Sequence, residues 1–264
     1  MLISVLTLLG GAPAAQGRAR VVSLDQCADQ YVLALAPRIE IVALSKRARQ
    51  ADSFTRASAA GLPLRRADSE TVLAERPTLV VRYWGGDSAL LRDLHARGVA
   101  VADIDDAATF AGVETNVRRV AAALGRPAAG EALIGRMRGE LARASGAWRG
   151  QEALYLTSAG FTAGPDTLVG AMLAAAGLKD LSRRPGYQPV PLEALALSPP
   201  AVLVEGFFGG GWAATQYWSP MRNPVIGGLA RSRPMVRLPG SILGCPAWFA
   251  ADGAAVLARA APRA

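Results

Sequence analysis

Histidine and lysine are nearly absent from this chain of 264 residues, and the common catalytic signatures are missing altogether. His95 is the single histidine, and only Lys46 and Lys179 among the 29 basic residues are lysines. One histidine cannot supply the several-histidine site that zinc or manganese usually occupies, and it argues against a Ser-His-Asp hydrolase. GxSxG, P-loop and HExxH patterns do not occur either. We therefore expect a protein that is not an enzyme, with no metal ligands and no cofactor of its own.

Cysteine is scarce as well, because the sequence contains only Cys27 and Cys245. No CxxC spacing is present, which argues against a metal site built from this pair. In an oxidising compartment an even pair of cysteines is a candidate disulfide, and the alternative is two buried thiols. The sequence leaves both possibilities open.

The charge is strongly of one sign, with a formal net charge of +8 and an isoelectric point near 10.3. Nearly all of the basic residues are arginines, and they are scattered along the chain rather than gathered in one stretch. Scattered arginines do not form the basic face that nucleic acids require, so no nucleic-acid partner is expected. This excess of positive charge fits a cationic soluble protein that tolerates an anionic ligand.

A hydrophobic run long enough to span a bilayer is also missing. The first 15 residues form a short apolar stretch that ends in small residues, a pattern typical of a signal peptide, which we assign to residues 1–17. No Lys or Arg precedes the run, and no cysteine follows it at the position of a lipid anchor. We expect export, with an N-terminal strand as the alternative.

Two 17-residue stretches, offset by 123 positions, resemble each other. In each stretch a glutamate, Glu70 or Glu193, opens a helix-like segment, and a proline, Pro77 or Pro200, follows seven residues later. Proline ends a helix, and the apolar, β-branched run after it suits a strand that is buried on both faces. Such a duplicated unit predicts two similar α/β lobes.

Helical and strand patterns alternate around these units, which favours parallel sheets. The predicted fold is α/β, with two Rossmann-like lobes joined by one long linker helix. After the leader, we expect an N-terminal ligand-binding lobe over 18–112, a helical linker over 113–149 and a C-terminal ligand-binding lobe over 150–264. Helical periodicity covers residues 107–147, with one break at 125–127. A helical linker permits little hinge bending.

Aromatic residues are few, and seven of the 16 lie in two glycine-containing loops after predicted strands. Aromatic side chains usually belong to cores, but grouped with glycines at strand ends they favour a ring-lined site for a large, partly apolar ligand. The seven are Tyr83, Trp84, Phe207, Phe208, Trp212, Tyr217 and Trp218. The candidate ligand-binding residues are Gln26, Lys46, Arg82, Tyr83, Trp84, Gly85, Phe161, Phe207, Phe208, Trp212 and Trp218.

Several segments together resemble one family of transport proteins. They are Arg-Val-Val-Ser-Leu at 20–24, Ile-Val-Ala-Leu-Ser at 41–45, the duplicated units with their glutamates and prolines, Trp-Gly-Gly at 84–86 and Leu-His-Ala-Arg-Gly-Val-Ala-Val at 94–101. Over about residues 20–262 the chain resembles the periplasmic substrate-binding proteins of ABC importers for vitamin B12 and iron-siderophore complexes. Members of that family have two lobes joined by one long helix, and the likeness is greatest to the B12-binding branch.

The resemblance implies a monomeric periplasmic protein that captures a cobalamin (corrinoid) or iron-siderophore chelate between its lobes and delivers it to an ABC-transporter permease. In that family one surface glutamate on each lobe docks onto arginine pockets of the permease, and Glu70 and Glu193 stand at the matching positions. Two separated charges of one sign suit a two-fold symmetric partner. The alternative is an ordinary solvated glutamate near a helix N-terminus.

The resemblance leaves the ligand open. The B12 branch uses aromatic and backbone contacts, whereas siderophore binders often add basic residues, and Lys46, Arg47 and Arg82 lie near predicted cleft loops. Haem is a further option, since tyrosine or histidine can ligate its iron. His95, however, falls within a predicted helix, where a packed or solvated histidine is expected.

Two other functions remain as alternatives. A two-lobed cleft enzyme, such as a glycosyltransferase, needs acidic residues at a nucleotide-sugar site, and the only acidic cluster is Asp103, Asp105 and Asp106. We expect that cluster simply to end the strand predicted at 99–104. A ligand sensor tethered to another protein is the third alternative.

Overall fold

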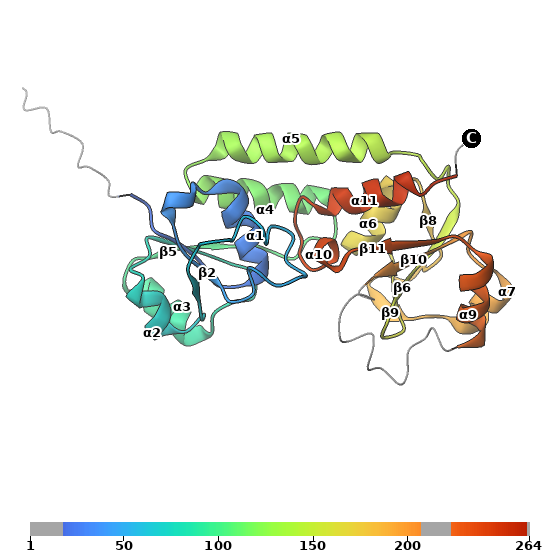
Figure 1. Cartoon of the computed structure of the whole chain (residues 1–264), viewed down its shortest axis with the longest axis horizontal. Coiled ribbons are helices and arrows are strands. Elements are labelled where there is room, and N and C mark those ends of the chain that lie inside the picture. Colours follow the sequence, from blue (N-terminus) through green and yellow to red (C-terminus); the bar gives the residue numbers. More distant parts are fainter. Residues whose placement is uncertain (1–17, 207–222, 263–264) are drawn as a thin grey trace, which may run out of the picture.

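The computed structural model describes residues 18–206 and 223–262, which form two lobes side by side (Figure 1). The sheet of the N-terminal lobe has the order β3-β2-β1-β4-β5, and all of its pairings are parallel. Its strands are β1 (Val21–Ser23), β2 (Ile41–Ser45), β3 (Leu64–Arg65), β4 (Leu79–Arg82) and β5 (Ala100–Asp103). Its helices are α1 (Gln26–Leu35), η1 (Arg38–Glu40), α2 (Ser69–Ala74) and α3 (Ser88–Ala96).

The C-terminal lobe has a parallel sheet of order β11-β10-β6-β8 and a small antiparallel pair, β7-β9. Its strands are β6 (Glu152–Thr157), β7 (Phe161–Ala163), β8 (Lys179–Asp180), β9 (Tyr187–Pro189), β10 (Val202–Gly206) and β11 (Met235–Leu238). Its helices are α6 (Leu168–Ala175), α7 (Leu192–Leu197), α9 (Pro224–Ser232), α10 (Gly240–Leu243) and α11 (Ala250–Arg259). None of the helices in the described residues is long and apolar enough to cross a membrane.

The two parallel sheets repeat one topology. In the N-terminal lobe β2-β1-β4-β5 are neighbours, and in the C-terminal lobe β8-β6-β10-β11 occupy the equivalent places. The duplicated sequence units form α2 with β4 in one lobe and α7 with β10 in the other. The predicted fold class, two α/β lobes with parallel sheets and a helical linker, is confirmed.

The linker consists of an antiparallel helix pair, α4 (Phe110–Ala123) and α5 (Pro127–Ala144). Gly125, at φ +67°, ends α4 in the left-handed conformation that glycine adopts easily. Pro127 begins α5, where the N–H group that proline lacks would have no partner within the helix. Figure 1 shows α5 running across both lobes, over α4 at one end and α11 at the other. One long helix therefore joins the lobes, as the sequence predicts.

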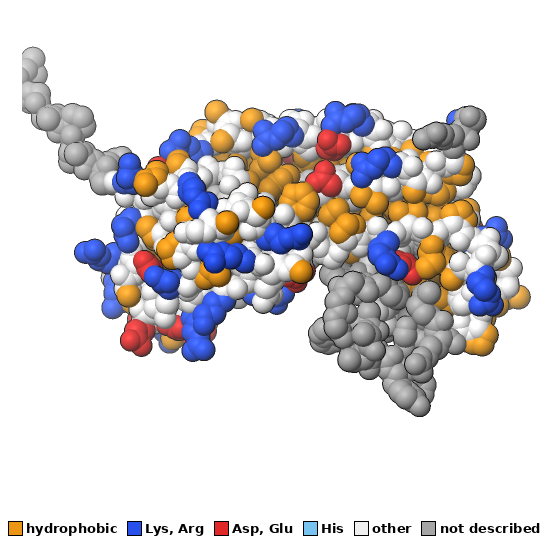
Figure 2. Space-filling model, viewed as in Figure 1, with side chains coloured by type: hydrophobic (Ala, Val, Ile, Leu, Met, Phe, Trp, Pro, Cys, Tyr) orange, Lys and Arg blue, Asp and Glu red, His pale blue; other side chains and the backbone are white. Residues whose placement is uncertain are grey.

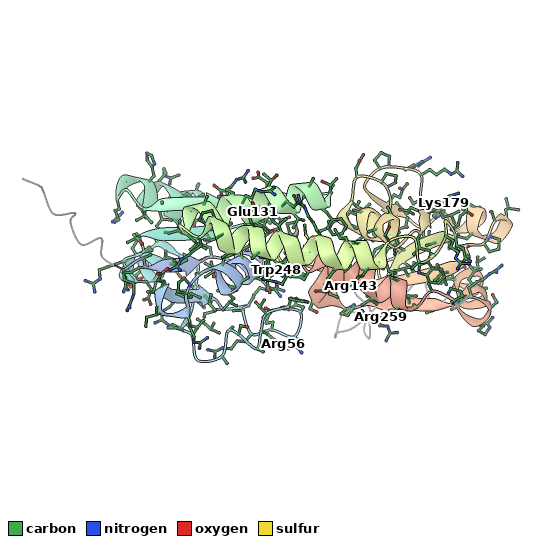
Figure 3. All side chains as sticks on the ribbon, turned by 90° about the horizontal axis from the view of Figure 1, so that it is seen from above. Arg56, Glu131, Arg143, Lys179, Trp248 and Arg259 are labelled. Carbon is green, nitrogen blue, oxygen red and sulfur yellow. A yellow bond between two sulfur atoms is a disulfide. The ribbon has the colours of Figure 1, made fainter. Side chains whose placement is uncertain are left out.

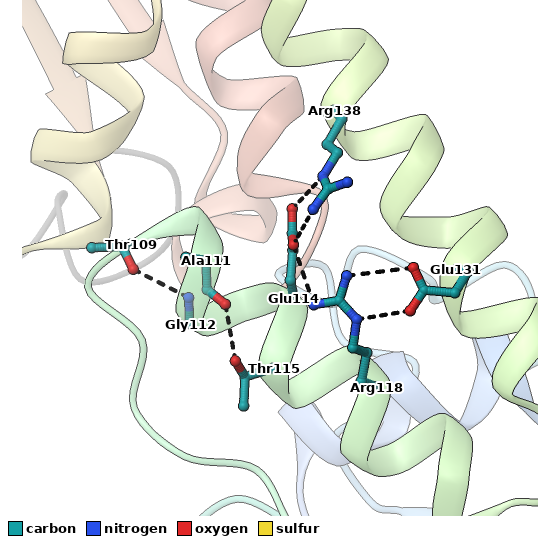
Figure 4. A network of polar contacts seen from close by, with 8 residues as sticks. All are labelled: Thr109, Ala111, Gly112, Glu114, Thr115, Arg118, Glu131 and Arg138. Carbon is teal, nitrogen blue, oxygen red and sulfur yellow. Dashed lines mark hydrogen bonds and ion pairs between the residues drawn. The ribbon is translucent and has the colours of Figure 1, made fainter.

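A network of ion pairs fixes α4 against α5 (Figure 4). Glu114 accepts two hydrogen bonds of 2.6 Å from the Arg138 guanidinium, and Arg118 pairs with Glu131 at 2.7 Å. Hydrogen bonding to Arg138 lowers the pKa of the Glu114 carboxyl. A bidentate arginine-carboxylate pair sets geometry as well as energy, so the network fixes the register of the two helices.

A second connection between the lobes is made by residues 245–249, which we call the strap. A disulfide joins Cys245 of the strap to Cys27 on α1, with an S–S distance of 2.08 Å. The Tyr31 hydroxyl donates to the carbonyl of Pro246, and the Tyr31 ring meets the ring of Trp248 edge to face at 5.5 Å. The strap thus attaches the end of the C-terminal lobe to the core of the N-terminal lobe.

A buried carboxylate orders the carboxyl ends of β1 and β2. Asp29 is fully buried and accepts hydrogen bonds from the backbone N–H of Ser45 at 2.9 Å and from its hydroxyl at 2.6 Å. Burial raises the pKa of the Asp29 carboxyl to about 6. The hydroxyl of Ser23, at the end of β1, also donates to this carboxylate. Asp29 therefore ties α1 to both strands at the sheet edge from which the cleft loops start.

We expect the disulfide to contribute about 2–4 kcal/mol to the free energy of unfolding, because it closes a loop with a sequence separation of 218 in the unfolded chain. Urea unfolding of the oxidised protein should show a lower midpoint after reduction. The Cys27→Ser/Cys245→Ser variant should match the reduced protein and should not respond to reductant. An unchanged midpoint after reduction would contradict this assignment.

Candidate functional site

The carboxyl ends of both parallel sheets face a cleft between the lobes, the position at which open α/β sheets receive ligands. The larger chamber of this cleft has a volume of about 1020 Å³. Its walls come from both lobes: Gln50, Ala51, Asp52 and Arg56 on one side, and Thr157, Ser158, Ala159, Phe161, Tyr187, Pro239, Gly240, Ser241 and Gly244 on the other. A space of this size accommodates a large ligand.

A smaller chamber of about 430 Å³ adjoins it. Its walls are Tyr83, Asp106, Ala107, Ala108, Asp166, Thr167, Leu168, Val169, Met172, Gly186, Tyr187, Leu243, Gly244, Cys245 and Pro246. Tyr187 and Gly244 line both chambers, so the two are parts of one cleft. The disulfide and the strap lie at the wall of the smaller chamber.

Aromatic rings of the C-terminal lobe form one wall of the larger chamber. Phe161 and Tyr187 lie on neighbouring strands, β7 and β9, and their side chains are 44% and 59% exposed. Rings that are this exposed gain more from covering a ligand than from the protein core. These two residues therefore offer exposed ring surface to a ligand.

The polar groups of the larger chamber are partly neutralised. Asp52 forms an ion pair with Arg47 at 2.9 Å and accepts a hydrogen bond of 3.0 Å from Gln26. Arg56 donates to the carbonyl of Ala51 at 2.8 Å, and Figure 3 shows it on the long loop of the N-terminal lobe. The larger chamber thus offers a ligand aromatic rings and polar groups that are already hydrogen-bonded or ion-paired, rather than a strong electrostatic potential of one sign.

The smaller chamber contains a phenol held by a carboxylate. The Tyr83 hydroxyl donates to Asp106, and burial together with that hydrogen bond raises the pKa of Tyr83 to about 12. Asp166, on the opposite lobe, also lines this chamber and has a φ of +62°. Aspartate adopts this left-handed conformation more readily than most residues.

One side chain fixes the loop that carries Tyr83. One oxygen of the Asp25 carboxylate caps α1 by accepting from the N–H groups of Cys27 and Ala28, at 3.0 and 2.9 Å. The other oxygen accepts from the N–H groups of Tyr83 and Gly85, at 2.7 and 3.0 Å. Asp25 therefore joins the start of α1 to the loop after β4.

Glycine at position 85 is required by a close approach of two backbones. A Cβ atom there would lie 2.7 Å from the backbone of Leu24, which no side chain tolerates. The carbonyl of Gly85 also accepts a hydrogen bond of 2.8 Å from Arg82. The predicted ligand residue Gly85 thus shapes the loop, and the structure gives it no place in the chamber walls.

The structure brings some of the predicted ligand residues together and leaves others apart. Tyr83 and Phe161 line the cleft, and Gln26 supports a lining residue, Asp52. Arg82 is engaged with Asp103 at 3.1 Å and does not line either chamber. Lys46 is exposed at the end of β2, and Trp84 is 70% exposed beside Tyr83. The predicted residues Phe207, Phe208, Trp212 and Trp218, with Tyr217, lie outside the described residues.

Lining residues that the sequence did not indicate include Tyr187, Asp52 and Arg56. Tyr187 follows a Pro-Gly pair and is an isolated aromatic residue in a polar stretch, the one signal that was available. The strand pair β7-β9 was also missed, because segments of three residues carry no period that a pattern can reveal.

The two predicted docking glutamates occupy equivalent positions. Glu70 and Glu193 each lie in the first turn of a six-residue helix, α2 and α7, and both are exposed. Among the described glutamates the only other exposed one is Glu131, which pairs with Arg118 on the linker. Glu70 and Glu193 are therefore the exposed glutamates, among the described residues, that form no ion pair with a described residue.

The acidic cluster that an enzyme would need is dispersed in the structure. Asp103 pairs with Arg82, Asp105 pairs with Arg119 at 2.6 Å, and only Asp106 lines the cleft. His95 is exposed on α3. Within the described ranges, no group of His, Cys, Asp and Glu side chains is arranged to hold a metal ion.

The basic residues do not form a single patch on the face shown in Figure 2. Lys and Arg side chains are spread over both lobes and the linker there, with apolar side chains between them. A dispersed positive charge of this kind supports solubility rather than the backbone-tracking groove of a nucleic-acid-binding protein.

Comparisons with known proteins agree with this geometry. A family profile described as periplasmic binding protein matches residues 9–206. The apo haem-binding protein RhuT from Roseiflexus sp. RS-1 has 25% sequence identity and a TM-score of 0.71, over 93% of this chain and 100% of that one. A periplasmic haem-binding protein from Pseudomonas aeruginosa has 25% identity and a TM-score of 0.71, over 92% of both chains.

A third solved structure, the vitamin B12-binding protein BtuF of Vibrio cholerae, has 16% identity and a TM-score of 0.64, over 91% of this chain and 95% of that one. At this identity the likeness concerns the fold alone. No curated protein matches the chain at a significant level.

We expect the Asp25→Ala variant to lose about 2–3 kcal/mol of stability, because it removes the cap of α1 and leaves two further N–H groups unpaired. The near-ultraviolet circular dichroism of the Tyr83–Trp84 pair, whose rings are 5.3 Å apart, should also change. Asp87→Ala is the matched control, since Asp87 caps α3 through Leu90 and does not line the cleft. It should cost about 1 kcal/mol and leave the spectrum unchanged. Equal spectra for the two variants would contradict the role given to Asp25.

Proposed function

The chain belongs to the periplasmic binding protein family, and from this premise we propose that it captures a corrinoid or an iron-siderophore type of chelate in its cleft and delivers it to an ABC-transporter permease. The family places the protein in the periplasm, and its structural neighbours include periplasmic haem-binding and vitamin B12-binding proteins. The observation that carries the proposal is the ring-walled chamber of about 1020 Å³ at the carboxyl ends of both sheets.

The size and chemistry of the cleft support a large, partly apolar ligand. Phe161 and Tyr187 provide ring surfaces, while Ser158, Ser241 and backbone groups supply a few polar contacts. The two lobes are held by both α5 and the strap, so the cleft is largely formed before the ligand enters. A preformed site loses less conformational entropy on binding than a protein whose lobes must first close about a hinge.

Exposed carboxylates support delivery to a permease. Glu70 and Glu193 repeat the same position in two lobes of the same topology, which suits a partner with two equivalent sites. Charge pairs of this kind mainly give orientation and speed of encounter. A carrier that must both bind and leave the membrane complex benefits from such contacts.

We expect saturable quenching of tryptophan fluorescence when the purified protein is titrated with cyanocobalamin or a ferric siderophore, with one ligand bound per chain by calorimetry. Tyr187→Ala should weaken binding roughly tenfold, because a large ring contact is lost. Ile39→Ala removes another exposed apolar side chain, remote from the chamber walls, and should leave the affinity unchanged. Absence of any response to corrinoids, siderophores and haem would refute the proposed ligand capture.

Reversal of the docking charges should impair transport and spare ligand binding. We expect Glu70→Arg and Glu193→Arg each to lower ligand uptake by reconstituted permease roughly tenfold, with a larger loss in the double variant. Glu131→Arg is the control, because Glu131 is also exposed but lies on α5. Uptake that is equal in all three single variants would argue against docking through Glu70 and Glu193.

A further inference from the structure

The strap contacts the walls of both chambers of the cleft. Cys245 and Pro246, at its start, line the smaller chamber. At its end, the ring of Phe249 stacks on the ring of Phe54, with 4.3 Å between the ring centroids. Phe54 belongs to the turn segment 50–56, which supplies part of the wall of the larger chamber. The position of the strap therefore affects the shape of the whole cleft.

A single covalent bond ties the strap to the N-terminal lobe. It is the disulfide between Cys245 and Cys27 on α1. Beside it, the Tyr31 hydroxyl donates a hydrogen bond to the Pro246 carbonyl, and the Tyr31 and Trp248 rings meet edge to face. Non-covalent contacts of this kind break and re-form within a folded protein, whereas the covalent bond persists until it is reduced. The disulfide is therefore the most durable of these ties.

The other half of the disulfide is connected to a second part of the chamber wall. Cys27 lies in the first turn of α1, which Asp25 caps. The Asp25 carboxylate accepts from the N–H of Cys27 at 3.0 Å and from the N–H of Tyr83 at 2.7 Å. Tyr83 lines the smaller chamber, as Cys245 does. The disulfide thus connects two parts of one wall that lie far apart in the sequence.

On these observations we propose that the Cys27–Cys245 disulfide is a redox-sensitive latch on the cleft. In the oxidised protein it holds the strap in place, so that both chambers are formed. In the reduced protein the strap opens locally and the walls loosen, while the two lobes stay folded and remain joined by α5. The latch is a property of the protein itself, so it goes beyond the proposed function and does not depend on which ligand the cleft takes.

The latch opens by exchange with a dithiol, which is the class of reductant that the step requires. One thiolate of the dithiol attacks the Cys245 sulfur, forms a mixed disulfide and releases Cys27, and the second thiol then displaces Cys245. Two electrons and two protons pass to the two cysteines, and the dithiol leaves as a disulfide. Cys245 lines the chamber and is 7% exposed, so the dithiol approaches through the cleft.

Hydrogen exchange followed by mass spectrometry tests the latch without any ligand. The full chain is compared in its oxidised form, after reduction with dithiothreitol, and as the Cys27→Ser/Cys245→Ser variant. At short labelling times we expect exchange in the strap, in segment 50–56 and in the loop at 83–86 to be at least about fivefold faster in the reduced protein and in the variant. Amides of β10 and of the middle of α5 should remain protected in every sample.

Two controls isolate the disulfide. The Cys27→Ser/Cys245→Ser variant should not respond to dithiothreitol, because the chain has no other cysteine. Tyr31→Phe removes the hydrogen bond to Pro246 but keeps the ring and the disulfide, so its oxidised form should exchange like the oxidised wild type. Exchange in the strap that is unchanged by reduction, an increase spread evenly over both lobes, or an oxidised Tyr31→Phe variant as fast as the reduced wild type would overturn the proposal.

A second measurement relates the latch to ligand binding, with cyanocobalamin, a ferric siderophore and haem as probes. A probe that binds occupies the chamber through which the dithiol approaches, so reduction by dithiothreitol should be roughly tenfold slower in its presence. An equal rate of reduction with a probe bound would contradict the position given to the latch. If none of the probes binds, the proposed function fails, whereas the exchange measurement still decides whether the latch exists.

Discussion

The arrangement of the two lobes depends on the strap, because its residues belong to the C-terminal lobe by sequence and to the N-terminal lobe by packing. Cys245, Ala247 and Phe249 of the strap are buried in the core that includes Tyr31. Directly after the strap, at the start of α11, Ala250 is buried in the core of the C-terminal lobe. Together with α5, the strap and the start of α11 therefore hold the two lobes together at the cleft.

The duplicated sequence unit predicts both parallel sheets because its signals are local: a proline after a short helix, then a buried β-branched run. The walls of the cleft were less accessible to such reasoning. Asp52 and Arg56 lie in a segment of turns whose sequence has no helical or strand periodicity. The position of this segment is fixed by hydrogen bonds to Gln30, which lies on α1. That buried side chain donates to Ser53 at 2.9 Å and accepts from the N–H of Thr55 at 2.8 Å.

The aromatic ligand site remains a prediction, and of its described residues Tyr83 and Phe161 line the cleft. Tyr83 lies in the cleft because the Asp25 carboxylate binds its backbone N–H. The sequence identifies Asp25 as a helix cap, but it does not show that the same side chain also holds a loop 58 residues away. Tyr187 reaches the cleft through a strand whose partner is β7, and that pairing is formed only in the folded chain. Arg82, which the sequence places near the ligand, is instead committed to Asp103 and the loop carbonyl of Gly85.

A common fold does not fix the chemistry of the ligand. This chain has the architecture of solved haem-binding and vitamin B12-binding proteins, yet the lining of its own cleft is a feature of its particular side chains. The residues that line the cleft come from both lobes, so the shape of the site depends on how the two lobes are held together.

The strap also has a consequence for the order in which the protein folds. Cys245, Ala247 and Phe249 complete the core of the N-terminal lobe, although they lie more than 200 residues after α1 begins. The core of that lobe is therefore complete only when the end of the chain is in place, and this long-range packing couples the folding of the two lobes.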